Sequence, residues 1–202
     1  MEKYIDYDMC KQCKGVCCKQ NGCVYMPSDF KSMKFTYLSK KLEEGKISIS
    51  GQATTIQSIG WTYMPYLRAR NKDAGIVDLI TKGGPCINLT DTGCSLSEDN
   101  RPTFGLLVKP TKVGGPCKQM NSQLGTEWLN YSEVLEKLVK YYTSKDMIDI
   151  VVDEISKMMI EIKNKKENNI ELNPMELTNA SWYYKIMVNR PYYTPEEVKQ
   201  MI

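Results

Sequence analysis

Five cysteines stand within fourteen positions near the start of the 202-residue chain, and three more follow between residues 86 and 117. Thiols this closely spaced serve either disulfide bonds or metal ions, which thiolates bind at about 2.3 Å. Cys17 and Cys18 are adjacent, which suits metal ligation better than a mutual disulfide, because bridged cysteines prefer Cα atoms about 5.5 Å apart. The sequence therefore favours a metal site with eight candidate ligands: Cys10, Cys13, Cys17, Cys18, Cys23, Cys86, Cys94 and Cys117.

The chain contains no histidine, so four-cysteine coordination is the simplest arrangement for the expected metal. Zinc is favoured, either as two separate tetrahedral ions or as a site in which two ions share thiolates. An iron–sulfur cluster is the alternative. The order of Cys10, Cys13 and Cys17 matches neither a ferredoxin nor the radical enzymes that cleave S-adenosylmethionine, so a cluster would need ligands distant in sequence.

Composition narrows the class of protein. The 27 basic and 24 acidic residues are spread along the chain, giving a net charge of +3 and no electrostatic footprint for nucleic acid. No apolar run approaches the roughly 18 residues of a membrane span. The charged, polar first residues do not resemble a secretory signal, so we expect a cytoplasmic protein whose thiols bind metal rather than form disulfides. The expected partner is a metal ion, and a protein partner is left open.

The elements that must position the first cysteines are expected to be short. Gly15 and Gly22 fall between cysteines, where a backbone that wraps a metal often needs positive φ, so a loop is predicted there. Further on, Ser28 or Asp29 can cap a helix that runs toward Gly45 and supports the cluster.

The remaining ligands are expected on turns and short strands. Residues 47–51 alternate apolar and polar side chains, which predicts a short strand. Cys86 and Cys94 flank an Asp/Gly-rich turn and are predicted on the two arms of a hairpin that meets the first cysteines in space. Cys117 is expected to reach the cluster from a loop.

An aromatic segment containing Trp61, Tyr63 and Tyr66 precedes Arg68 and Arg70. Aromatic rings beside guanidinium groups can bind a nucleotide or phosphate. Because no glycine-rich phosphate loop accompanies them, core packing of the aromatics with surface or salt-bridged arginines is favoured.

Helical periodicity begins near residue 126, where cysteine disappears and glycine becomes rare. One helix is predicted around residues 134–142, and a second is predicted to be capped by Ser144 and to carry an apolar face over residues 148–162. A last short helix is predicted from Thr194. The expected fold is α+β and mostly α: an irregular cysteine-rich metal-binding region with short strands, residues 1–125, packed as one unit against a helical region, residues 126–202.

The cysteine motifs resemble those of a known family. They comprise Cys10-x₂-Cys13-x₃-Cys17-Cys18, Cys23 before Pro27-x-Asp29, Gly84-x-Cys86, Gly93-Cys94-Ser95-Leu96 and Arg101-Pro102. Over residues 8–117 this series is similar to the CxxCxxCC-type, or YkgJ-like, cysteine-cluster proteins, which are described as zinc- or iron-chelating domains. The family commonly has another cysteine three residues after the Arg-Pro pair, where this chain has Gly105. The eighth ligand is therefore either absent or replaced by Cys117.

The resemblance implies metal binding without naming a reaction, since the family as a whole lacks an agreed one. Similar cysteine clusters occur in flagellin lysine methylases, so an iron–sulfur protein with redox or methyltransferase-type activity stays an alternative. Against it, the chain has no glycine-rich nucleotide motif after a clear strand and no histidine to act as a base. Whether the protein is an enzyme is left open.

Overall fold

The computed structural model describes residues 5–56, 60–81, 83–109, 111–115, 117–119 and 126–172. Within these ranges helices are mixed with small two-stranded antiparallel sheets, so the fold class is α+β. The helices are α1 (Tyr7–Cys13), α2 (Val16–Gln20), α3 (Phe35–Glu43), α4 (Thr103–Leu106), α5 (Ser132–Thr143) and α6 (Met147–Glu167), with 3₁₀ turns η1 (Pro27–Asp29), η2 (Glu98–Asn100) and η3 (Thr126–Tyr131). The strand pairs are β1 (Ile47–Ile56) with β2 (Gly60–Ala69), β3 (Leu89–Thr90) with β4 (Gly93–Cys94), and β5 (Val108–Lys109) with β6 (Lys118–Gln119).

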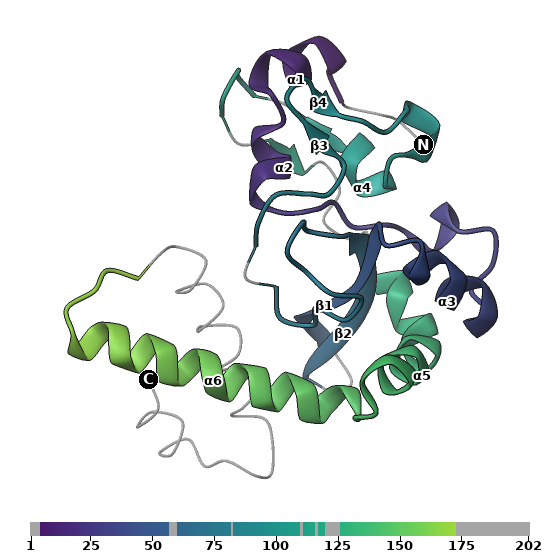
Figure 1. Ribbon diagram of the computed structural model, residues 1–202. Helices are drawn as coiled ribbons and strands as arrows, with labels where there is room; N and C mark the ends of the chain where they lie inside the picture. The colour runs from purple at the N-terminus through teal and green to yellow at the C-terminus, as the bar shows by residue number, and fades with distance from the viewer. Residues whose placement is uncertain are drawn as a thin grey trace.

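The hairpin of β1 and β2 lies at the centre of the molecule (Figure 1). Its register runs from Ile47 opposite Ala69 to Ile56 opposite Gly60, so β1 is twice as long as the strand predicted over residues 47–51. Its partner β2 is the aromatic segment, for which no strand was predicted. Gly51 leaves room for the ring of Tyr63, since a Cβ at position 51 would lie 2.3 Å from that ring.

Helices α5 and α6 share one hydrophobic core with this hairpin and with α3. The periodicity of α6 is confirmed, because Val151, Ile155 and Ile162 are buried together with the two methionines at 158 and 159. Trp128 of η3 is completely buried and donates a hydrogen bond from Nε1 to the carbonyl oxygen of Tyr25 at 2.8 Å. Figure 1 shows α5 and α6 on one side of the hairpin and the cysteine-bearing elements α1, α2, β3 and β4 on the other.

The first cysteines lie on two short helices rather than in the predicted loop. The Asp6 side chain accepts a hydrogen bond from Met9 N at 2.9 Å and caps α1, which then ends at Lys14 and Gly15 with φ of 50° and 65°. The positive φ expected of Gly15 is therefore present. It separates α1 from α2 and does not support a longer loop.

Two predicted helix starts were wrong. The side chain of Asp29 accepts a hydrogen bond from Met26 N at 2.8 Å, which closes the turn η1, and α3 begins only at Phe35. Ser144 adopts the left-handed conformation with φ of 59° and ends α5, while Asp146 stands at the N-cap of α6. The helix predicted from Thr194 lies outside the described residues.

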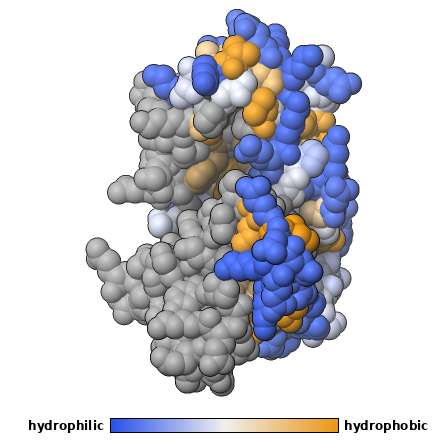
Figure 2. All heavy atoms as spheres, turned by 90° about the vertical axis from the view of Figure 1, so that its left-hand side faces the viewer, coloured by the Kyte–Doolittle hydropathy of each residue, from blue (hydrophilic) through white to orange (hydrophobic). Residues whose placement is uncertain are grey.

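The described helices do not have the length and apolar character needed to cross a membrane. On the face shown in Figure 2, hydrophilic side chains dominate the described surface, and hydrophobic residues form small groups between them. Tyr141 and Ile160 are among the exposed large apolar side chains.

Substitution of Gly22 tests the closeness of the cysteine-bearing segment to β2. A Cβ at position 22 would lie 1.9 Å from the carbonyl oxygen of Ala69, so Gly22→Ala is expected to cost about 2 kcal/mol or more of unfolding free energy in urea. Gly75→Ala is the matched control, because its Cβ meets only an ordinary contact at 3.6 Å. Equal stability of the two variants would contradict the close approach.

Candidate metal centre

Five of the eight cysteines line one cavity of about 60 Å³. They come from separate parts of the chain: one each on α1, α2 and β4, one after α2 and one before β3. A cavity of this size exceeds the roughly 15 Å³ that one water molecule needs. The structure thus gathers thiols that the sequence separates by more than 80 residues: Cys10, Cys18, Cys23, Cys86 and Cys94.

Backbone hydrogen bonds hold three of these cysteines beside the end of β2. Cys86 N donates to the carbonyl oxygen of Cys18 at 2.7 Å, and Gly84 N donates to that of Gln20 at 2.7 Å. On the other side, Ala69 N donates to the carbonyl oxygen of Cys23 at 2.8 Å. The segment of residues 18–23 therefore lies between β2 and the loop that carries Cys86.

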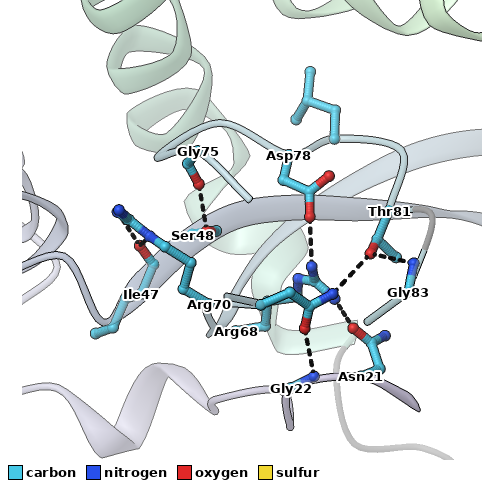
Figure 3. Close-up of polar contacts among 12 residues, drawn as sticks. Asn21, Gly22, Ile47, Ser48, Arg68, Arg70, Gly75, Asp78, Thr81 and Gly83 are labelled. Carbon is cyan, nitrogen blue, oxygen red and sulfur yellow. Dashed lines mark hydrogen bonds and ion pairs between the residues drawn. The ribbon is translucent and has the colours of Figure 1, made fainter. Parts of the chain in front are cut away.

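A network of side chains joins the segment after α2 to the end of β2 and to the loop that follows β2 (Figure 3). We call it the anchor network and define it as Asn21, Arg68, Asn71, Asp78 and Thr81. The guanidinium of Arg68 donates to the side chain of Asn21 and forms an ion pair with Asp78. The Asn71 side chain accepts from the backbone N–H of residue 22 at 2.9 Å and donates to Thr81 at 3.3 Å.

The hydrogen bonds of Arg68 and Arg70 show whether these arginines are available to bind a nucleotide or phosphate. Arg68 is 0% exposed and pairs with Asp78, while Arg70 donates to the carbonyl oxygens of Leu42 and Ile47 at 3.1 Å and 2.8 Å. The favoured interpretation is confirmed for the buried rings of Tyr63 and Tyr66 and for the salt bridge of Arg68. Both guanidinium groups are used inside the protein.

Cys86 is the most enclosed of the described cysteines, with 5% of its surface exposed. Burial raises the pKa of its thiol, and the backbone and side-chain N–H groups of Asn88 act in the opposite direction and lower it. Asn88 is itself 5% exposed and lines the cavity, and within the described residues its Nδ2 has no hydrogen-bond partner. N–H donors aimed at a sulfur are the partners that ligand thiolates need.

The phenol of Tyr25 lies near the same thiols. Its pKa is raised by burial first and then by the negative charges that Cys86, Asp29 and Cys23 would carry. A raised pKa keeps this hydroxyl protonated, so Tyr25 remains a neutral donor beside the cysteines.

Gly105 lines the cavity from α4 and lies beside Cys23. A Cβ at this position would come within 3.3 Å of Cys23 Sγ. The backbone of Gly105 has no positive φ, so its conformation alone does not require glycine. Glycine serves here to leave space next to the thiol, at the position where the resembling family commonly has a cysteine.

Three predicted ligands are not placed at this cavity by the described residues. Cys13 ends α1, and its sulfur accepts a hydrogen bond from Gly114 N at 3.1 Å. Cys117 directly precedes β6 and is not among the described residues that line the cavity. Cys17 belongs to α2, but its side chain lies outside what the structure describes.

The residue types around the cavity suit a thiolate-bound metal, but the sulfur atoms are not arranged around one point. In the described ranges, no three cysteine or carboxylate side chains converge closely enough to hold a metal ion as they stand. Rotating a cysteine about its Cα–Cβ bond to another staggered position moves the sulfur by about 3 Å. Binding of an ion by these thiols would therefore require changes in their rotamers.

Sequence reasoning missed both the anchor network and the buried position of Asn88 beside Cys86. An asparagine two residues after a cysteine, at the neck of a predicted hairpin, was the available signal for the latter. No comparable pattern marks Arg68 and Asp78 as partners, because the loop between them brings them together.

Comparison with known proteins finds no family model, no curated protein and no solved structure that matches this chain. The resemblance to the YkgJ-like family therefore continues to rest on the cysteine motifs alone.

Breaking the anchor network is expected to be costly. Arg68→Met leaves Asp78 and Asn21 without their cation, and loss of one partner of a buried pair costs about 3 kcal/mol. Urea unfolding of this variant, with exposed Lys72→Met as the control, measures that cost. The double variant Arg68→Met/Asp78→Asn should be more stable than Arg68→Met, since it removes the unpaired carboxylate. A single variant as stable as the control would show that the pair does not hold these segments.

Proposed function

We propose that this chain is a cysteine-ligated metal-binding protein that takes up zinc. One observation carries the proposal: five thiols from five places in the sequence line a single small cavity. Cys10, Cys18, Cys23, Cys86 and Cys94 supply the ligands of this centre, which needs four for a tetrahedral ion. Cys13, Cys17 and Cys117 are the remaining candidates for a second ion.

The surroundings of the cavity support a charged thiolate centre. Four thiolates around Zn²⁺ carry a net charge of about −2, which a buried site must offset. Asn88 lowers the pKa of the Cys86 thiol and so favours its thiolate, and Arg101 lines the cavity. Burial of Cys86 favours its protonated thiol, so metal binding at this position displaces a proton.

An iron–sulfur cluster is the second candidate, with redox or methyltransferase-type activity. It is favoured by the space beside Gly105, which keeps the cavity larger than one ion needs, and by N–H donors directed at a thiol, which tune such clusters. In either case the cysteine-rich region of residues 1–125 is the metal-binding unit. The described helices α5 and α6 support it through the central hairpin.

The biological setting follows from the chemistry of the thiols. Thiolate ligands persist in a reducing compartment, so we place the protein in the cytoplasm in a structural or regulatory role. The proposed partners are the metal ion and a protein still to be identified. Neither nucleic acid nor a membrane is proposed as a partner.

Metal analysis of anaerobically purified protein tests the proposal and separates its two forms. Bound zinc and no colour are expected, whereas a brown protein that absorbs near about 400 nm would be an iron–sulfur protein. Cys18→Ser and Cys86→Ser should each lose metal from the centre, because each removes a ligand. Ser95→Ala, an exposed neighbour of Cys94, should keep its full metal content.

A chain that carries no metal when purified and titrates with all eight thiols reactive would refute the function. So would full metal retention in both cysteine variants. Cys117→Ser shows whether a second ion exists, since only that ion should then be lost.

Chelation should unfold the cysteine-bearing elements while the helical core survives. The described residues of α1, α2, β3 and β4 do not belong to the hydrophobic core, whereas α5 and α6 do. Hydrogen exchange with and without a chelator should therefore show protection lost over residues 10–23 and 86–94 and kept in α5 and α6. Unchanged protection at Cys10 to Cys23 after verified metal loss would mean that these thiols are ordinary packed side chains.

A further inference from the structure

A second, more open cavity of about 520 Å³ lies next to the cysteine cavity. It lies between α1 with the following Lys14, the hairpin turn with β4, and Arg101. This volume is within the range of roughly 300–1,000 Å³ that small-molecule sites occupy. We call it the outer pocket, and its lining residues are Tyr7, Cys10, Lys11, Lys14, Asp91, Thr92, Gly93, Cys94 and Arg101.

The outer pocket and the cysteine cavity share a wall. Cys10, Gly93, Cys94 and Arg101 line both. A molecule bound in the outer pocket therefore lies directly against two of the proposed metal ligands.

The charge of the outer pocket is positive. Lys11, Lys14 and Arg101 line it against a single carboxylate, Asp91, which gives 3 − 1 = +2. Among the described residues, none of these three cations forms an ion pair. Three cations left without carboxylate partners around one concavity are suited to an anionic ligand.

Arg101 is held in place for such a role. Its Nε donates to the carbonyl oxygen of Leu96 at 3.2 Å, and its guanidinium carbon lies 4.8 Å from the centre of the Tyr7 ring. Stacking and one backbone hydrogen bond fix the plane of the guanidinium. Its two terminal nitrogens make no hydrogen bond within the described residues, and they form the fork that binds phosphate or carboxylate oxygens in pairs.

We propose that the outer pocket binds a small phosphomonoester, with its phosphate held by Arg101, Lys11 and Lys14. The net charge of +2 in the lining matches a phosphate dianion better than a single carboxylate. The pocket is larger than one phosphate group, so the organic part of the ligand fills the remainder and reaches the wall of Cys10 and Cys94. The inference goes beyond metal binding and does not depend on it.

Calorimetric titration of the full chain as purified tests this binding. The probes are inorganic phosphate, glycerol phosphate and neutral glycerol at constant ionic strength. Both phosphates should bind and glycerol should not, and Lys11→Gln/Lys14→Gln should weaken phosphate binding by about 10-fold or more. Lys31→Gln/Lys40→Gln removes the same charge from exposed positions outside the pocket and should leave the affinity unchanged.

Asp91→Asn provides a variant that gains affinity, which a misfolded protein would not do. Removing the only carboxylate of the lining should tighten phosphate binding by about 3-fold. Metal content should be unchanged in Lys11→Gln/Lys14→Gln. Metal analysis and phosphate titration of this variant therefore test the metal centre and the outer pocket separately.

Three results would overturn the proposal. The first is no saturable binding of either phosphate up to about 10 mM, and the second is equal weakening by the two double-lysine variants. The third is loss of metal in Lys11→Gln/Lys14→Gln, since the lysines would then act on the cysteine centre and not on a separate ligand.

Discussion

The arrangement of the cysteines depends on one buried cation. Arg68 is 0% exposed, and removing a guanidinium from water costs several kcal/mol unless its donors are paired. Its partners come from two different places: Asn21 follows α2, and Asp78 lies in the loop after β2. The need to satisfy Arg68 therefore brings together the segment of Cys18 and Cys23 and the loop that continues to Cys86.

Two glycines also allow the close packing of the segments that carry the cysteines. A side chain at position 22 would clash with the backbone of Ala69. Glycine therefore lets this segment approach β2 closely enough for backbone hydrogen bonds to form on both of its sides. Gly105 stands in α4, where glycine costs about 1 kcal/mol relative to alanine. The absence of a side chain at Gly105 leaves room beside Cys23, which offsets this cost. The cavity is therefore a consequence of the sequence and is not a defect of packing.

The sequence predicted the parts of the structure in which a short pattern decides the outcome. The apolar stripe of α6 and the hairpin that carries Cys94 follow from spacing. The prediction that Cys86 lies on the first arm of that hairpin was wrong, because Cys86 precedes β3 and bridges to Asn71. Strand β2 was missed because aromatic and polar residues mix around Pro65 without a clean alternation. The burial of Arg68 could not be foreseen, since a charged residue is almost never fully buried unless paired, and its partners are 10 and 47 residues away.

The shared wall of the two cavities links their chemistry through charge. Metal binding by four cysteines would change neutral thiols into a centre of about −2 that Cys10 and Cys94 share with the outer pocket. This charge would repel a phosphate dianion across the shared wall, so a bound metal would weaken anion binding in the outer pocket. By linkage, any weakening of anion binding by the metal equals the weakening of metal binding by the anion. The shared wall of Cys10 and Cys94 is therefore the place where the charge of a metal centre would act on a ligand in the outer pocket.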